Sequence, residues 1–219
     1  MKKRVFNICT FLIIVVLAMA QGEVNHDPKA KAILDGVSAK TKTHKAVSVR
    51  FTYSMENIKD DIYETMEGSL LLYGDRYNLK LAGQEIICDG STLWTYIQDA
   101  EEVQISEPEY EEGAISPNNI FTIYEHGFKY KYIKEVQKNG RTMQIINLYP
   151  IKANEKPYHT IKLSVDKAKK QIQMITVVGK EGDNYIYDII KFTSNPATKE
   201  SDFKFNIVDH PGVELVDLR

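Results

Sequence analysis

Apolar and polar residues alternate along much of this 219-residue chain. Such alternation is typical of β-strands that bury one face. The clearest run has an apolar residue at every second position from Val47 to Met55. Further strands are predicted near residues 63–73, 77–81, 85–88, 92–98, 103–105, 128–132, 143–148, 161–165, 172–176, 185–192, 203–207 and 213–216. Asn139-Gly140 lies between two of these runs and predicts a tight two-residue hairpin.

Two segments have helical spacing instead. Asp27-Pro28 provides an N-cap and a first-turn proline, and an apolar stripe that includes Leu34 and Val37 follows them. Ser116-Pro117 precedes residues 118–126, which we interpret as a short helix that ends at Gly127. The elements together predict a mainly β fold: a single curved antiparallel sheet with the helices on one face.

The first twenty residues have the composition of a secretory signal peptide. Lys2, Lys3 and Arg4 precede an apolar run that is too short to span a bilayer. Cleavage is expected after Ala20, which would leave residues 21–219 as one domain in an exported protein. Cys9 would leave with the peptide, so Cys88 would have no disulfide partner within the chain.

Charge and composition exclude several classes of function. The formal net charge is −2, and loss of the leader's three positive charges would make it −5, which disfavours nucleic-acid binding. The five histidines do not have metal-ligand spacing, and neither GxSxG nor a glycine-rich phosphate loop is present. We therefore expect no metal, no cofactor and no enzymatic activity.

The acidic residues require separate consideration. Seven carboxylates and no basic residue lie in residues 99–112. A solvated loop is the simplest interpretation, a docking surface for a basic partner is the second, and a hydrolase that uses a carboxylate pair is the weakest. No apolar surroundings that would raise the pKa of one acid are evident there.

Large apolar side chains are abundant, with thirteen tyrosines, eight phenylalanines and one tryptophan. They could fill a core, or they could line a hollow that two small helices leave open beneath many strands. Periodicity alone leaves both interpretations open.

The order of several motifs then resembles the outer-membrane lipoprotein carrier (LolA-like) family. Residues 89–96 read DGSTLWTY and are followed by an acidic turn and Val103. Gly68-Ser69-Leu70, Tyr77-Asn78-Leu79, Ser116-Pro117 and the closing residues 203–213 occur in the matching order. The resemblance implies a half-open barrel of about eleven antiparallel strands, with the helices as a lid on its concave face.

The resemblance also implies a binding site. It places lipid acyl chains against cavity and lid residues, which here are Phe51, Tyr53, Leu70, Leu72, Tyr77, Leu79, Leu81, Trp94, Tyr96, Ile120, Phe121 and Tyr124. Members of the family hold the lid closed with an arginine, but Tyr73 occupies that position here and Arg76 lies three residues later. Tyr73 and Arg76 are therefore the candidates for lid contact.

Two functions follow as hypotheses. The first is a monomeric periplasmic carrier that takes lipoprotein acyl chains from an ATP-driven releasing complex in the inner membrane to an outer-membrane acceptor. The second is an envelope sensor module on the same fold, which binds lipid or lipoprotein and regulates a partner protein through the acidic segment.

Overall fold

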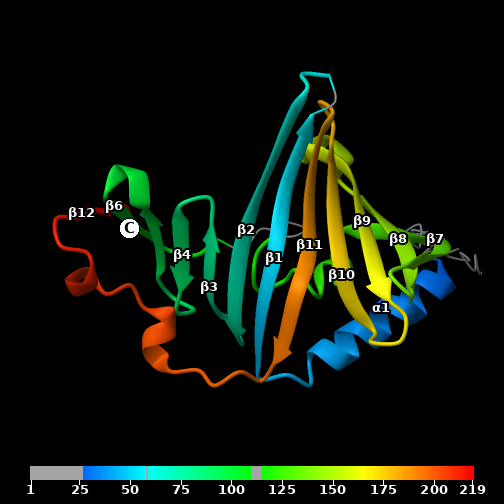
Figure 1. Cartoon of the computed structure of the whole chain (residues 1–219), viewed down its shortest axis with the longest axis horizontal. Helices are drawn as coiled ribbons and strands as arrows, with labels where there is room; N and C mark the ends of the chain where they lie inside the picture. Colours follow the sequence, from blue (N-terminus) through cyan, green and yellow to red (C-terminus); the bar gives the residue numbers. More distant parts are fainter. Residues whose placement is uncertain (1–26, 58, 110–114) are drawn as a thin grey trace, which may run out of the picture.

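Twelve strands form one open, curved sheet in the computed structural model, which describes residues 27–57, 59–109 and 115–219 (Figure 1). The strands are β1 (Ala46–Asn57), β2 (Ile62–Tyr73), β3 (Arg76–Leu81), β4 (Gln84–Cys88), β5 (Leu93–Ile97), β6 (Glu102–Ser106), β7 (Phe128–Lys138), β8 (Arg141–Pro150), β9 (Tyr158–Asp166), β10 (Gln171–Gly179), β11 (Asp183–Ser194) and β12 (Glu214–Asp217). Their order across the sheet is β12-β6-β5-β4-β3-β2-β1-β11-β10-β9-β8-β7. The predicted mainly β fold with a single curved sheet is confirmed.

The sheet consists of two antiparallel meanders that meet where β1 pairs with β11. One meander runs from β1 to β6 and the other from β7 to β11. The predicted Asn139-Gly140 turn joins β7 to β8, and both residues have positive φ, at 52° and 71°. The last strand differs from the expectation of a purely antiparallel sheet, because β12 pairs with β6 in parallel.

Helix α1 (Pro28–Thr41) packs against β7 and β10 on the concave face. Asp27 caps it by accepting hydrogen bonds from the backbone amides of Lys29 and Ala30 through Oδ1, while Oδ2 accepts one from the amide of Tyr132 on β7. The apolar stripe is buried, with Leu34 fully inaccessible to solvent. Burial of one such leucine stabilises the fold by about 1.5–3 kcal/mol. No helix in the described parts of the chain is long and apolar enough to cross a membrane.

The alternating residues of β1 divide into a buried set on the concave face and a polar set on the convex face. Val47, Val49 and Phe51 of β1 are buried in the core, whereas Arg50 between them is exposed. Register shifts interrupt the alternation at several points, and two of them lie near the middle of the sheet: between Arg50 and Phe51 of β1 against β11, and between Ile172 and Met174 of β10 against β9. A bulge changes which face the following side chains occupy.

The predicted helix over residues 118–126 is wrong. This part of the chain forms successive tight turns and then a single 3₁₀ turn, η2 (Ile123–Glu125). Its backbone hydrogen bonds span three residues, from Asn119 to Ser116, from Thr122 to Asn119 and from Glu125 to Thr122. Asparagine and β-branched residues have low helix propensity, which favours these turns over an α-helix.

The predicted strand over residues 203–207 is also wrong. Two 3₁₀ turns, η4 (Glu200–Phe203) and η5 (Ile207–Asp209), occupy this region instead. Side chains stabilise both turns, since Asp202 accepts from the amide of Lys199 and Asn206 accepts from the amide of Val208. The other 3₁₀ turns are η1 (Gln98–Ala100) and η3 (Ala153–Glu155). The expected signal peptide, residues 1–20, lies outside the described residues.

Candidate functional site

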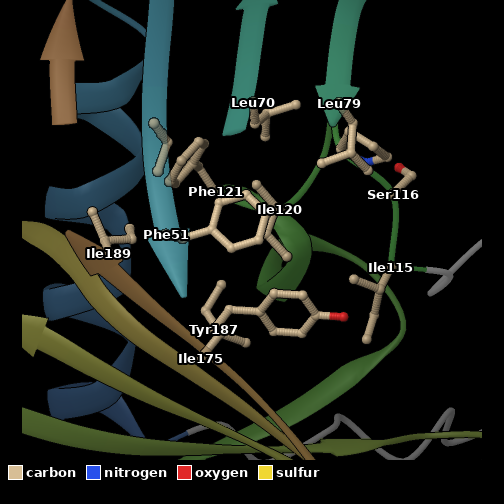
Figure 2. A pocket seen from close by; sticks show the side chains of 12 residues that line it. Phe51, Leu70, Leu79, Ile115, Ser116, Ile120, Phe121, Ile175, Tyr187 and Ile189 are labelled. Atoms are coloured by element: carbon tan, nitrogen blue, oxygen red, sulfur yellow. The ribbon is translucent and has the colours of Figure 1, made fainter. Parts of the chain in front are cut away.

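An apolar cavity of about 180 Å³ lies on the concave face (Figure 2). It lies between the strands and the first part of residues 115–127, which we call the closing segment. The lining residues come from β1, β2, β3, β10, β11 and the closing segment: Val49, Phe51, Leu70, Leu79, Ile115, Ser116, Pro117, Ile120, Phe121, Ile175, Tyr187 and Ile189. Almost all are aliphatic or aromatic, so the cavity suits an apolar guest.

A glycine on β2 makes room for one wall of the cavity. Phe51 of β1 is paired with Gly68 of β2, and its ring lies over that glycine. A Cβ atom at residue 68 would lie only 2.5 Å from Cζ of Phe51. The absence of a side chain at Gly68 therefore lets Phe51 lie flat beside the cavity, with its ring centroid 6.0 Å from that of Tyr187.

The closing segment is held at Phe121, near its middle, and at Glu125, near its end. Phe121 packs edge-to-face on Phe192 of β11, with ring centroids 6.0 Å apart. Further along, Glu125 accepts hydrogen bonds from Ser38 Oγ at 2.6 Å and from Lys42 Nζ at 2.7 Å, both on or next to α1. We call these contacts of Glu125 the latch. Tyr124 Oη also donates to Oδ1 of Asp35 on α1, at 3.2 Å.

The pKa values of Glu125 and of the neighbouring Tyr124 are both shifted. Burial tends to raise the pKa of Glu125, but the hydrogen bonds from Lys42 and Ser38 and the charge of Lys42 outweigh it, so this pKa lies below its usual value. Burial is the main reason that the pKa of Tyr124 is well above its usual value. Glu125 is therefore ionised and Tyr124 neutral around neutral pH, which are the states that these contacts require.

Three tyrosines pack together beside the cavity. The ring centroid of Tyr53 lies 5.2 Å from that of Tyr187 and 6.4 Å from that of Tyr185. Burial, followed by the neighbouring tyrosines, raises the pKa of Tyr187 to about 12. Of the three, Tyr187 lines the cavity itself.

The structure brings together some of the predicted site residues. Phe51, Leu70, Leu79, Ile120 and Phe121 line the cavity. The others on the concave side lie near it. Tyr53 packs beside Tyr187, Leu72 lines a neighbouring hollow together with Phe121, Leu81 lies next to Gly68, and Tyr77 and Tyr124 belong to the core.

Trp94 and Tyr96 do not line the cavity, contrary to the sequence expectation. On β5 it is Leu93, paired with buried Cys88, that packs against the core, and alternation places Trp94 and Tyr96 on the opposite face. The ring of Tyr96 contacts Phe205 and His210, with centroid distances of 5.5 and 4.5 Å. Trp94 and Tyr96 therefore lie on the convex face.

Tyr73 and Arg76 are likewise not lid contacts. They pair with each other across the β2–β3 hairpin, and the guanidinium of Arg76 lies over the rings of Tyr73 and Phe203, at 4.7 and 5.4 Å. Phe203 belongs to residues 195–213, which we call the C-terminal strap. The strap leaves the end of β11 and runs along the lower edge of the sheet, as drawn in Figure 1, to β12. Arg76 thus holds the strap, and the latch at Glu125 holds the closing segment instead.

Sequence reasoning missed more than half of the lining residues. Val49 alternates with the predicted Phe51 on β1 and is paired with the predicted Leu70 on β2, so the pattern could have identified it. Ile175, in contrast, lies beyond the bulge in β10, so the alternation through Ile172, Met174 and Thr176 pointed to the wrong face for the second half of that strand. Tyr187 and Ile189 lie on β11, whose register against β1 also shifts.

The described acids of residues 99–112 are divided among several elements, and Glu111 and Glu112 lie outside the described residues. Asp99 lies in η1, Glu102 begins β6, and Glu107 and Glu109 follow that strand. Within the described ranges, no group of three or more His, Cys, Asp or Glu side chains is placed to hold a metal ion. These acids are separate from the cavity lining.

Comparison with known proteins identifies the family. A family model described as outer membrane lipoprotein carrier protein LolA matches residues 42–206. The chain belongs to this LolA family. The matched range includes the strands of the cavity and the whole closing segment. Proteins of this family are carriers or binding proteins. A search of curated protein sequences found no match to this chain.

Solved structures that match this chain do so at low sequence identity. An uncharacterized conserved protein from Thermus thermophilus is 11% identical and has a TM-score of 0.57, with 86% of this chain and 99% of that chain covered. A LolA superfamily protein from Nitrosomonas europaea is 11% identical with a TM-score of 0.42, and 80% and 97% are covered. The MucA/MucB complex of Pseudomonas aeruginosa contains a chain that is 12% identical with a TM-score of 0.40, and 80% and 61% are covered.

Proposed function

We propose that this LolA-family protein is a periplasmic carrier that shelters the acyl chains of lipoproteins in the concave cavity and transfers them between membranes. The observation that supports this proposal is the apolar cavity, which the closing segment covers. Hydrogen bonds from Ser38 and Lys42 to Glu125 attach this segment to α1. The proposal is of a binding protein, since the described lining has the hydroxyls of Ser116 and Tyr187 as its side-chain polar groups and offers no acid–base pair.

The volume of the cavity limits how much of an acyl chain it can hold while the closing segment is in place. At about 180 Å³ it is only slightly larger than a cavity of roughly 150 Å³ that accommodates benzene. It can therefore hold part of one acyl chain in the closed state. We propose that entry of a whole chain moves the closing segment away from the strands, which breaks the latch and the Phe121–Phe192 contact.

That opening would make transfer possible. Burial of an acyl chain is worth about 0.8 kcal/mol per CH₂, so a chain of roughly 15 methylenes would gain about 12 kcal/mol, equivalent to nanomolar affinity. The free energy needed to open the closing segment subtracts from this gain. A carrier requires such a reduction, because a ligand that is bound too tightly cannot be passed to an acceptor. In a periplasmic setting, the donor would be an ATP-driven inner-membrane complex and the acceptor an outer-membrane protein.

A substitution in the cavity tests the proposal. Ile175→Phe places a larger side chain in the lining, whereas Met174→Phe places the same side chain on the opposite face of β10. We expect folded I175F to have an affinity for a fluorescent acyl probe at least tenfold lower than that of the wild type, and M174F to bind as the wild type does. Equal binding by both variants, or no binding by the wild type, would contradict the proposal.

Transfer distinguishes a carrier from a regulatory module. The wild-type protein, loaded with a triacylated peptide, should deliver it to acceptor vesicles faster than the peptide moves without protein. A protein that binds the peptide and does not deliver it would favour the sensor hypothesis over the carrier.

A further inference from the structure

We infer that the hydroxyl of Tyr187 is the polar anchor of the cavity, and that it donates a hydrogen bond to the carbonyl oxygen of an acyl ester or amide. This inference rests on the proposed function and specifies the ligand class. It predicts that the site prefers neutral acyl groups to plain hydrocarbons and to fatty-acid anions.

The position of the Tyr187 ring is set by its neighbours. Tyr187 is paired with Tyr53 of β1 on one side and with Ile175 of β10 on the other. Its ring packs against Phe51, at 6.0 Å between centroids, and against Tyr53, at 5.2 Å. Figure 2 shows the hydroxyl directed away from β10 and toward Ile115 across the cavity. The ring is therefore part of the wall, and its polar end is presented to the cavity.

The hydroxyl is also available for a ligand. Ser116, the other lining residue with a polar side chain, already donates to Oδ1 of Asn118 at 2.6 Å. Among the described residues, no hydrogen-bond partner is found for the hydroxyl of Tyr187. An acyl chain that fills the cavity would displace water from this group, and a buried donor without an acceptor is costly. A ligand that brings its own acceptor to this point avoids that cost.

Protonation narrows the class of ligand. Burial raises the pKa of Tyr187 to about 12, so the hydroxyl remains a neutral donor throughout the physiological range. No lysine, arginine or histidine is present among the lining residues given above. An ionised carboxylate would lose its hydration there without gaining a counter-charge, which is unfavourable. A neutral ester or amide carbonyl needs only one donor, which Tyr187 supplies.

Matched probes test the inference. Hexadecane, methyl palmitate and palmitate would compete with a bound fluorescent acyl probe, at pH 8 so that palmitate is ionised. We expect the wild type to prefer the ester over both others. In Tyr187→Phe the affinity for the ester should fall about five- to tenfold, as expected for one lost hydrogen bond, while the affinity for hexadecane stays the same or rises. Tyr185→Phe is the control, because Tyr185 lies on the same strand and face outside the lining.

A spectroscopic measurement gives a second criterion. The infrared carbonyl band of ¹³C-labelled methyl palmitate should move to lower frequency on binding to the wild type and to Y185F, and should not do so in Y187F. If Y187F binds the ester as tightly as the wild type and the band moves equally in both, the inference is overturned while the carrier proposal stands. If none of the three compounds displaces the probe from the wild type, the carrier proposal itself fails.

Discussion

Ser38 Oγ donates a hydrogen bond of 2.6 Å to Oε1 of Glu125, although the two residues lie 87 positions apart in the chain. One is on α1 and the other is at the end of η2, so this contact joins the N-terminal helix to the segment that covers the cavity. Lys42, one position beyond the end of α1, donates to the same carboxylate oxygen at 2.7 Å.

The latch predicts faster ligand entry when it is removed. Glu125→Ala eliminates the acceptor of both hydrogen bonds, and because the site is partly exposed we expect a loss of about 1 kcal/mol in unfolding free energy. Uptake of a fluorescent acyl probe, measured by stopped flow, should become several-fold faster. Glu155→Ala serves as the control, since Glu155 pairs with Lys152 on the exposed surface at 3.7 Å. Unchanged uptake in E125A would show that the latch does not limit entry.

The latch should also respond to acid. Because the pKa of Glu125 is lower in the folded protein than in the unfolded chain, its ionisation stabilises the closed state above the unfolded value of about 4.3, and this stabilisation is lost as the pH falls through the folded value. Uptake of the probe should therefore accelerate between about pH 5 and pH 3. In Glu125→Gln this acceleration should be reduced. An identical pH profile in both proteins would assign the response to other groups.

Two glycine-to-alanine substitutions should have opposite effects on stability. At Gly68 the new Cβ would lie 2.5 Å from Cζ of Phe51, so the ring must move and we expect a loss of about 1–3 kcal/mol. At Gly36 in α1 the contact would be an ordinary 3.7 Å to Lys170, and the higher helix propensity of alanine should stabilise the protein by about 0.5–1 kcal/mol. Urea denaturation measures both. G68A should also weaken binding of the acyl probe, because Phe51 lines the cavity.

The C-terminal strap should be important for stability and not for binding. Phe203 is only 1% exposed and contacts Tyr73 and Arg76 on the convex face. We expect Phe203→Ala to lower the unfolding free energy by about 3–5 kcal/mol while the folded fraction binds the acyl probe normally. Phe121→Ala is the comparison, because it removes a buried ring from the cavity lining and should weaken binding. If folded F203A binds the probe more weakly than the wild type, the strap on the convex face influences binding on the concave face, contrary to this prediction.

Local signals accounted for most of the elements. Asp27 and Pro28 marked the start of α1, alternation located the strands, and Asn139-Gly140 marked the β7–β8 turn. These features act over a few residues, so they can be recognised without knowledge of the fold. The turns that end in η2 were mistaken for a helix, because Asn118, Asn119 and the β-branched residues there have low helix propensity. The 3₁₀ turn η4 replaces the start of the predicted strand, and there the side chain of Asp202 accepts a hydrogen bond from the amide of Lys199.

The sequence by itself determined that the chain would form a curved, mainly β fold with a half-buried sheet, because alternation and turn residues are properties of neighbouring positions. Tertiary structure alone decided which face each alternating set would occupy. On β5, Leu93 and Ile97 form one apolar set and Trp94 and Tyr96 form another, so either could have faced the cavity. The choice depends on the strap, more than 100 residues further along, which covers Tyr96 with Phe205 and His210. Likewise, a bulge in β10 that leaves no mark in the pattern brings Ile175 to the cavity.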